Sequence, residues 1–455
     1  MELKKRILGR VVHTGDEEYE RIRQAMAWNA LKPDRKPELI VQVASEKDAV
    51  ETVNFARENK MKIAVRGGGH NWCGSSIRDG GILLDLSPLN AVEVDPEKRV
   101  AIVQPAITNR EFARKLAEHD LAFPFGHCPS VPLCGYILGG GLGWNIGYWG
   151  VACFSLLALD VVTADGKLIR ASEDENSDIL WAARGSGPGF FGVATKYYLR
   201  VYPLPKAITT SMLMFPLDSL PEVLAWVEEV AGKIPSFVEL TLLFTSTPPP
   251  LADRCKQVCI VVATAFADTA QMASEALSPF DNCPLENFVM KDLDANTPFD
   301  ALFDTMDRFF PEGKRYAIDN MWSHTHPIIL LSTLRDQFIK APSPHSLSFS
   351  LILPPRFADA PPMPDAAFSM IGPVFAYFGA IWDDASQDKP NIDWLRNAMQ
   401  ALESIGVGHY IGETDLTAHP SRSVRSFSQR NWERLEELRK KYDPDGIFHS
   451  FIGSE

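Results

Sequence analysis

Two glycine-rich segments hold the residues that are best suited to chemistry. The first, Arg66-Gly67-Gly68-Gly69-His70, follows a short apolar stretch and leads to Ser75 and Ser76. Consecutive glycines expose backbone N–H groups that can surround an anion, and the arginine and the two hydroxyls would add charge and further donors. The loop therefore predicts a binding site for a pyrophosphate, with a simple surface turn as the alternative.

The second segment and the end of the first offer nucleophiles. Cys128 lies in a loop, and its neighbour His127 would lower the pKa of the thiol and so favour the reactive thiolate. The alternative for this cysteine is a small buried side chain, which is what most free cysteines are. His70 leaves a similar choice open, because a single histidine more often makes ordinary hydrogen bonds than it reacts.

Several familiar sites are excluded by their spacing. The run Gly141-Leu142-Gly143-Trp144-Asn145-Ile146-Gly147 departs from G-x-G-x-x-G by one residue, and no acidic residue completes a dinucleotide-binding unit further on. Neither C-x-x-C nor H-E-x-x-H occurs, so we expect no metal. A G-x-S-x-G elbow and a P-loop are also absent, which leaves hydrolases and kinases without support.

Composition and charge narrow the class of protein. The 455 residues are 45% hydrophobic and exceed the usual size of one domain, so we expect two or three domains. Forty-five Lys and Arg against 58 Asp and Glu give a net charge of −13, which repels nucleic acid and anionic membranes. The odd number of cysteines, seven, and the lack of a long apolar run favour a reducing, cytoplasmic location.

Helices and strands must hold these loops in place. Ser45 and Asp48 predict the start of an amphipathic helix, and Thr108 and Glu111 form a capping box for another. Because of its glycine content, we read 125–150 as a loop without helices. The other elements expected in this part are strands at 63–65, 82–86 and 194–201, helices at 109–119 and 178–183, and a hairpin of 156–163 and 167–171.

After Pro203 and Pro205 the pattern changes to longer elements. We expect strands at 211–216, 237–246, 257–267, 347–353 and 373–383, and helices at 220–232, 268–279 and 391–405. Their order predicts a second domain, an antiparallel sheet with helices on one face. The end of the chain, with a helix at 431–441, forms a compact tail.

The order of the motifs resembles the berberine-bridge-enzyme-like branch of the vanillyl-alcohol-oxidase (PCMH-type FAD-binding) flavoproteins. The resemblance covers about 37–202 and 405–451, and it implies an α+β fold with a discontinuous FAD-binding domain, 1–205 and 405–455, around a substrate-binding domain, 206–404. The motifs that carry it are Val65-Arg66-Gly67-Gly68-Gly69-His70, Gly80-Gly81-Ile82-Leu83-Leu84-Asp85-Leu86-Ser87, Gly139-Gly140-Gly141-Leu142-Gly143-Trp144, Val161-Val162-Thr163-Ala164-Asp165-Gly166, Leu180-Trp181-Ala182-Ala183-Arg184-Gly185 and Asp443-Pro444.

By this resemblance, FAD is held covalently. His70 would be joined to the 8α-methyl of the flavin, and Cys128 would join C6 of the same ring. Val131 would lie on the oxygen-access side, where a small residue lets O2 reach the reduced flavin. The remaining cofactor contacts that the resemblance implies are Gly67, Gly68, Gly69, Ser75 and Ser76 around the pyrophosphate, and Gly139, Gly140, Gly141, Gly192 and Val193 elsewhere.

The resemblance does not extend to the substrate site. The family's Tyr-x-Asn is Tyr410-Ile411-Gly412 here, and Asp-Pro-x-Asn-x-Phe is Asp443-Pro444-Asp445-Gly446-Ile447-Phe448. Candidates for the base that takes the substrate's proton are Tyr148, Tyr377, His409, Tyr410 and Glu413, and we favour Tyr377 and Tyr410, with aromatic packing as the alternative for both.

The function expected is an oxidase that removes hydride from an alcohol or amine and forms H2O2. Phe349, Phe375, Phe378, Trp382 and Trp72 favour an aromatic or alkaloid-like substrate. A dehydrogenase or oxidative cyclase with another acceptor, a sugar oxidase and a non-catalytic binding protein stay open. We expect a monomer or homodimer with no nucleic-acid or membrane partner.

Overall fold

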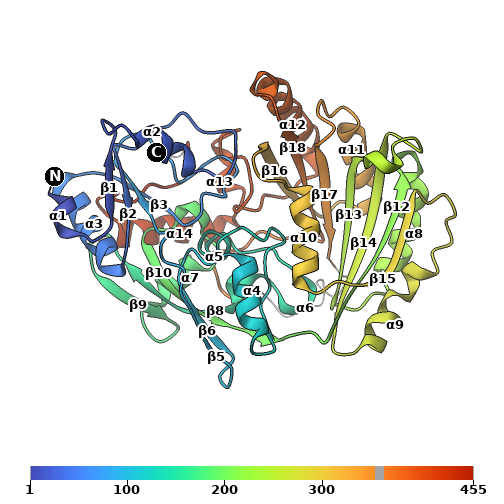
Figure 1. Ribbon diagram of the computed structural model, residues 1–455, viewed down its shortest axis with the longest axis horizontal. Coiled ribbons are helices and arrows are strands. Elements are labelled where there is room, and N and C mark those ends of the chain that lie inside the picture. The colour runs from blue at the N-terminus through green and yellow to red at the C-terminus, as the bar shows by residue number, and fades with distance from the viewer. Residues whose placement is uncertain (1, 354–362, 454–455) are drawn as a thin grey trace.

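A computed structural model describes residues 2–353 and 363–453 of the protein (Figure 1). Three main sheets, of four, five and seven strands, are combined with helices in an α+β fold, which confirms the predicted fold class. The two smaller sheets lie beside each other at one end of the molecule, and the seven-stranded sheet occupies the other end.

The four-stranded sheet carries the first glycine loop. Its order is β1-β2-β4-β3, in which β2, β4 and β3 run parallel and β1 runs antiparallel. Ser45 accepts a hydrogen bond from the Asp48 N–H at the start of α3, as predicted. The elements are β1 (Arg10–His13), β2 (Leu39–Gln42), β3 (Ile63–Arg66), β4 (Ile82–Asp85), α1 (Leu3–Arg6), α2 (Tyr19–Ala25) and α3 (Glu46–Asn59).

The five-stranded sheet is antiparallel, with the order β5-β6-β10-β8-β9. The predicted hairpin is confirmed as β8 and β9, and Thr108 and Glu111 form the predicted capping box of α4. The elements are β5 (Val92–Asp95), β6 (Val100–Val103), β8 (Leu156–Val162), β9 (Leu168–Ser172), β10 (Val193–Arg200), α4 (Asn109–Ala117), α7 (Ser177–Ala183) and a ribbon of β7 (Leu121–Ala122) and β11 (Tyr202–Pro203).

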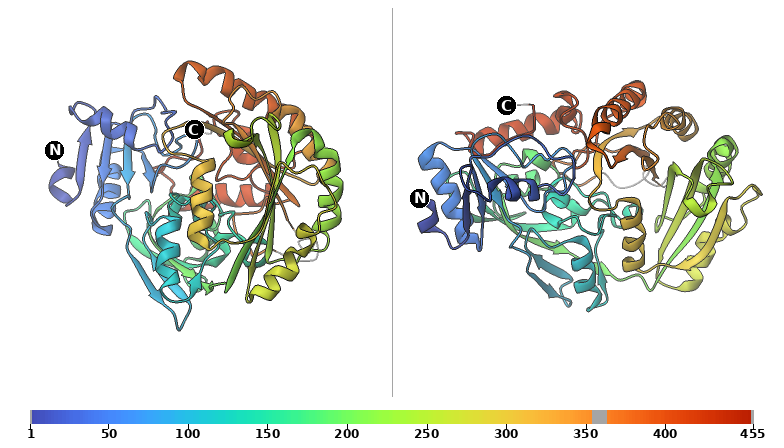
Figure 2. Two further views of the ribbon diagram at one scale, coloured as in Figure 1. Left: turned by 45° about the vertical axis from the view of Figure 1, so that its right-hand side comes forward. Right: turned by 45° about the horizontal axis from the view of Figure 1, so that its top comes forward.

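The seven-stranded sheet is also antiparallel, with the order β15-β12-β14-β13-β17-β18-β16. Figure 2 shows helices along its outer side, as predicted. They are α8 (Leu220–Ala231), α9 (Ala270–Asp281), α11 (Pro327–Phe338) and α12 (Asp388–Leu402). The strands are β12 (Ala207–Pro216), β13 (Val238–Ser246), β14 (Gln257–Ala267), β15 (Met290–Asn296), β16 (Arg315–Ser323), β17 (Leu347–Ile352) and β18 (Val374–Trp382).

A fifth helix, α10 (Phe299–Phe309), lies on the other side of this sheet and packs against α4. Its Phe299 meets Phe125 edge to face, with ring centroids 5.0 Å apart. In this sheet domain, α10, β15, β16 and α11 were not predicted from the sequence. Apolar and polar residues alternate only weakly in β15 because the strand is rich in charged residues. In β16, Asp319 and Asn320 interrupt the apolar pattern.

The prediction that 125–150 lacks helices was wrong. Two short helices, α5 (Leu133–Leu138) and α6 (Ile146–Trp149), interrupt the glycine-rich loops. α5 begins after Pro132 and buries most of its apolar side chains, so tertiary packing stabilises a helix that its glycine content disfavours. The helix presents Tyr136 and the thiol of Cys134 to the region in front of the first glycine loop.

The end of the chain returns to the four-stranded sheet. The Ile63 N–H donates to the Ile447 carbonyl over 2.7 Å, and Ile63 forms a parallel bridge with Phe448. Helix α14 (Gln429–Tyr442) packs against α7, and α13 (Ser421–Val424) precedes it. Before these helices, Gly408 pairs with Trp322 of β16, so the segment after it lies between the large sheet and the smaller ones.

Candidate functional site

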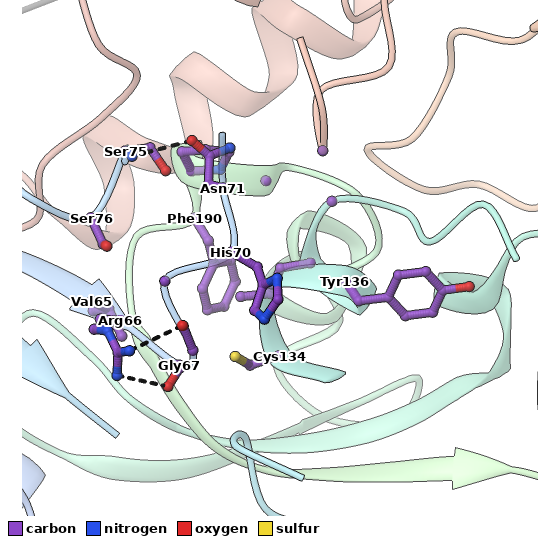
Figure 3. A pocket seen from close by; sticks show the side chains of 18 of the residues that line it. Val65, Arg66, Gly67, His70, Asn71, Ser75, Ser76, Cys134, Tyr136 and Phe190 are labelled. Atoms are coloured by element: carbon purple, nitrogen blue, oxygen red, sulfur yellow. Dashed lines mark hydrogen bonds between the residues drawn. The ribbon is translucent and has the colours of Figure 1, made fainter. Parts of the chain in front are cut away.

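Loops that are far apart in the sequence enclose a cavity of about 240 Å³ between β3, β10, α5 and the segment 410–413. We call it the larger cavity. Figure 3 shows Arg66 and Gly67 at the left and Tyr136 at the right, with His70 and Cys134 between them. Of the predicted cofactor-binding residues, those that line it are Arg66, Gly67, Gly68, Gly69, His70, Ser75, Ser76, Cys128, Val131, Gly139 and Gly192, together with Tyr410 from the predicted catalytic pair.

The first glycine loop approaches its neighbours so closely that no side chain fits. A Cβ on Gly67 would lie 1.8 Å from the Cys134 Sγ, and one on Gly69 would lie 2.0 Å from the Met26 carbonyl oxygen. Gly69 also has a φ of +70°, which favours glycine. The N–H groups of Gly68, Gly69 and His70 donate to no other described residue, so these donors remain available to an anion.

Arg66 stabilises the first glycine loop through its hydrogen bonds and an ion pair. Its guanidinium forms an ion pair with Asp85 at 2.7 Å and donates to the carbonyl of Met26 at 2.7 Å and to that of Gly68 at 3.0 Å. The side chain lines the larger cavity, but most of its donors are already used within the protein. The predicted charge contribution to a pyrophosphate therefore competes with these contacts, and Arg66 stabilises the loop in any case.

His70 is kept neutral by its surroundings. Burial, and to a lesser extent the charge of Arg66, lower its pKa to about 3. Its ring stacks on Trp28, with centroids 4.9 Å apart. The Nδ1 atom is buried and has no hydrogen-bond partner among the described residues. A neutral imidazole with a free ring nitrogen is a nucleophile, which fits the predicted attachment to a flavin methyl group.

The predicted effect of His127 on Cys128 was wrong. Burial raises the pKa of the Cys128 thiol, and the contact with Ser130, whose Oγ lies 3.7 Å from the Sγ, only partly opposes this. His127 is instead engaged with Glu239, because its Nε2 lies 2.7 Å from the Glu239 Oε1. Cys128 nevertheless lines the larger cavity, within the same space as His70.

A smaller cavity adjoins the larger one on the side of the seven-stranded sheet. Its wall on the sheet side is aromatic and apolar, with Phe349 from β17 and Phe375 and Tyr377 from β18. The rings of Phe349 and Tyr377 are stacked, with centroids 5.1 Å apart. Six residues line both cavities and form the wall that they share: Trp72, Cys128, Val131, Tyr136, Tyr410 and Glu413.

The two tyrosines predicted to be catalytic face this region in different ways. Tyr377 lines only the smaller cavity, and Tyr410 lines both. The Tyr410 hydroxyl accepts a hydrogen bond from the Gly141 N–H over 3.0 Å. Burial raises the pKa of each phenol, so both are neutral at ordinary pH.

Glu413 is the strongest additional candidate in the shared wall. Burial raises its pKa to about 7, although His127 acts in the opposite direction. From the sequence, Glu413 was only one of five candidate bases. The signal that was available is that an acidic residue directly follows Tyr410-Ile411-Gly412, the segment that replaces the family's Tyr-x-Asn.

Comparisons with known proteins show to which family the chain belongs. Residues 37–172 match the model of an FAD-binding domain. The chain is 30% identical to the FAD-linked oxidoreductase nodO of Hypoxylon pulicicidum over 441 residues, which are 96% of this chain and 95% of the relative. The chain belongs to the family of FAD-linked oxidoreductases.

Solved structures of other oxidoreductases share the fold. 6-Hydroxy-D-nicotine oxidase from Arthrobacter nicotinovorans superposes with a TM-score of 0.84 at 20% identity, covering 99% of this chain and 98% of that one. Berberine bridge enzyme from Eschscholzia californica gives a TM-score of 0.82 at 20% identity, covering 98% and 97%. At these identities the likeness establishes the fold alone.

The larger cavity of this FAD-linked oxidoreductase fits its cofactor by its own chemistry. Unpaired N–H groups in a glycine cradle suit a pyrophosphate, and the free Nδ1 of His70 suits a covalent bond. No group of three or more His, Cys, Asp or Glu side chains in the described part of the chain is arranged to hold a metal ion. Within that part, no helix has the length and hydropathy required to span a membrane.

Three predicted cofactor contacts of the oxidoreductase lie outside the lining of both cavities. Gly140 packs against Phe368, to which an added Cβ would approach within 2.6 Å. Gly141 supports Tyr410 through its N–H. Val193 is buried in β10, where it pairs with Val162 of β8. These residues lie behind the cavity wall, and a direct contact with FAD stays a prediction for them.

Proposed function

We propose that this chain is an FAD-dependent oxidase of small aromatic or alkaloid-like alcohols or amines. The observation that carries this proposal is the shared wall, because a molecule in the smaller cavity would border the cofactor in the larger one. FAD, when bound, accepts a hydride from a carbon of the substrate and passes the electrons to an acceptor. The chain's own residues bind, orient and shield the reactants.

The cofactor would be held by backbone donors and two covalent bonds. The glycine loop would bind the pyrophosphate together with Ser75 and Ser76, and His70 and Cys128 would each be joined to the flavin ring. The neutral state of His70 supports its part in this attachment. Because burial raises the pKa of Cys128, bonding at this thiol requires the flavin itself to favour the thiolate, so we expect attachment at His70 first.

The proposed substrate class rests on the lining of the smaller cavity. Aromatic rings from two strands offer flat apolar surfaces, and the few polar side chains are those of the shared wall together with His127 and Tyr377. Relatives with similar folds or sequences are named for nicotine and berberine chemistry, which agrees with an aromatic or alkaloid-like molecule. Sugars remain the second candidate, since aromatic rings also stack on sugar faces.

The sequence favoured Tyr377 and Tyr410 as the base that takes the substrate's proton. Because burial raises the pKa of both phenols, we propose instead that they assist as hydrogen-bond donors. Their neutral hydroxyls can donate a hydrogen bond to the substrate oxygen or nitrogen and orient it. Replacement by Phe removes the hydroxyl and keeps the ring. If Tyr377→Phe and Tyr410→Phe both leave the rate of flavin reduction unchanged, the assignment is wrong.

Two domains are proposed to divide this work. The seven-stranded sheet and its helices fall within 206–404, and the smaller sheets together with the returning C-terminal segment fall within 1–205 and 405–455. The domain of 1–205 and 405–455 would bind FAD, and the domain of 206–404 would supply the wall of the substrate site.

Anaerobic mixing of the purified protein with benzyl alcohol, benzylamine or glucose tests the function. We expect the aromatic alcohol or amine to bleach the flavin, and admission of O2 to restore its colour with one H2O2 formed for each turnover. Bleaching without rapid recovery in O2 would identify a dehydrogenase, and bleaching by glucose alone would identify a sugar oxidase. No bleaching by any compound of a wider alcohol and amine panel would contradict an oxidase.

Oxygen access can be tested separately at the shared wall. Val131 lines both cavities and is predicted to leave room for O2. Val131→Ile adds one methylene at this position. We expect the reduced flavin of this variant to react more slowly with O2 while its rate of reduction by substrate is unchanged.

A further inference from the structure

Glu413 is the one acidic side chain among the described residues that line the smaller cavity, and it lines the larger cavity as well. No other described residue donates a hydrogen bond to its carboxylate or pairs with it by charge. Glu413 is half-buried, and carboxylates held away from bulk water are usually paired or hydrogen-bonded, because an unpaired charge there is costly. An unpaired carboxylate at the junction of two cavities is therefore a functional candidate.

The turn that carries Glu413 is fixed on both sides. The Thr414 hydroxyl and the Asp415 N–H donate to Asp319 Oδ1 over 2.9 and 3.1 Å. Asn320, the next residue of β16, donates to the Tyr410 carbonyl over 3.0 Å. Glu413 is thus free at its carboxylate while its backbone is anchored to the large sheet, which is the arrangement that a preorganised proton acceptor requires.

Several ionisable groups face this carboxylate. His127 lowers the pKa of Glu413, whereas burial raises it to about 7. In turn, Glu413 raises the pKa values of four groups from α5, β18 and the loops around them: Cys128, Tyr136, Tyr377 and Tyr410. Near neutral pH the carboxylate can therefore both accept and release a proton, which suits a general base.

His127 lines the smaller cavity together with Glu413 and is fixed by its own contacts. Its Nε2 lies 2.7 Å from Oε1 of Glu239, a buried residue of β13. The other oxygen of Glu239 accepts a hydrogen bond from the Asn145 N–H over 3.0 Å. The imidazole also packs against Trp144, with ring centroids 4.1 Å apart. The large sheet thus fixes the ring that influences Glu413.

We propose that Glu413 is the base that takes the proton from the substrate's hydroxyl or amine, and that His127, fixed by Glu239, is its positioning residue. This rests on the proposed function. The O–H or N–H bond breaks, its electron pair stays on the oxygen or nitrogen, and the proton moves to a Glu413 carboxylate oxygen. The C–H bond breaks with its electron pair, as the hydride that the proposed function assigns to FAD.

This role also restricts the substrate. The reacting carbon must carry an O–H or N–H group that reaches the shared wall, while the apolar remainder lies among Phe349, Phe375 and Tyr377. A carboxylate next to the reacting carbon would meet the like charge of Glu413 and is disfavoured. The class is therefore an aromatic or alicyclic alcohol or amine without an adjacent acid group.

The test uses the flavin-loaded enzyme and its Glu413→Gln, Glu413→Asp and His127→Gln variants. Glu433→Gln, an exposed residue of α14, is the matched control. Infrared difference spectra from about pH 5 to 9 report the protonation of buried carboxyl groups directly. We expect a carboxyl band that titrates near neutral pH in the wild type and in Glu433→Gln, and that is missing in Glu413→Gln.

Flavin reduction by benzyl alcohol or benzylamine supplies the second readout. The wild-type rate should fall as the pH drops below about 7, because the base becomes protonated. Glu413→Gln should lower the rate by about 100-fold or more and abolish this pH dependence, and Glu413→Asp should restore part of the rate. In His127→Gln, the loss of the facing histidine should raise the pH at which the rate falls, with the flavin content unchanged.

The outcomes separate this proposal from the proposed function. Absence of a titrating band, or a Glu413→Gln variant that reduces flavin within about threefold of the wild type with the pH dependence intact, overturns the proposal while oxidation itself stands. A band that titrates and disappears in Glu413→Gln, combined with no bleaching by any alcohol or amine, shows that the proposed function has failed, and the role in catalysis falls with it.

Discussion

The two cavities share a wall but are built from different parts of the chain. The larger is formed mainly by backbone, in glycine loops where a side chain on Gly67 or Gly69 would overlap its neighbours. The smaller is formed by side chains, above all aromatic rings on β17 and β18 and a single carboxylate. The difference indicates that the proposed substrate site can change by side-chain replacement while the proposed cofactor site stays the same.

The largest expected effect is on the larger cavity, which is formed mainly by backbone. Gly69→Ala places a Cβ 2.0 Å from a backbone oxygen in a left-handed conformation, so we expect a loss of about 2–4 kcal/mol in unfolding free energy and little retained FAD. Gly80→Ala is the control, because Gly80 has a similar φ of +68° but no atom within 4 Å of the added Cβ. It should cost about 1 kcal/mol and keep the flavin. Equal effects in urea unfolding would refute the close packing of the loop.

The second prediction concerns the charge of Glu413 in the smaller cavity. The pKa of Glu413 is raised to about 7, so the folded protein holds this proton more tightly than the unfolded chain, and the stabilisation is lost as the pH rises through 7. The Glu413→Gln variant does not lose unfolding free energy in this way, because glutamine does not titrate. Relative to the wild type, the variant should gain about 2 kcal/mol of unfolding free energy between pH 5 and 7.5, after allowance for solvent screening. A difference that does not depend on pH would show that the carboxylate is not buried in this way.

The third prediction exchanges one aromatic ring in each cavity. Phe349→Leu removes the stacking on Tyr377 and should raise KM for the substrate about tenfold, with the FAD content unchanged. Phe190→Leu, in the lining of the larger cavity, should instead weaken flavin retention and leave KM almost unchanged. If both variants change the same quantity, the two cavities do not have separate roles.

The smallest expected effect is at the surface contact between the two halves of the molecule. Arg110 of α4 forms ion pairs with Asp304 at 2.7 Å and Asp307 at 2.8 Å on α10. These carboxylates are exposed, so Arg110→Ala should cost less than about 1 kcal/mol, and the cost should fall further in high salt. A larger, salt-independent loss in urea unfolding would mean that this contact orients the seven-stranded sheet.

The same contrast explains what the sequence could predict. The first glycine loop, His70 and the capping boxes are contiguous motifs, so their geometry follows from local rules, and the resemblance to the family supplied the cofactor. The smaller cavity joins β17, β18 and the turn at 410–413, which are remote in the chain. Glu413 could be named only as one candidate among five, and the engagement of His127 by Glu239 depends on a pairing that no local pattern predicts.

The regular part of the large sheet was predicted where strands alternate or are wholly apolar, as in β14 and β18. It was missed where buried polar residues interrupt the pattern. Asp319 and Asn320 in β16 serve the turn that carries Tyr410 and Glu413, so the same residues that hid the strand hold the site in place.

The mass of the intact polypeptide in acid tests the central claim most directly, since acid unfolds the protein and releases any flavin that is not covalently bound. The account predicts that the wild type keeps the mass of one FAD, that Cys128→Ala keeps it as well, and that the double variant His70→Ala, Cys128→Ala loses it. A wild-type polypeptide with the mass of the sequence alone, and free FAD in the supernatant, would contradict covalent attachment at His70 and Cys128.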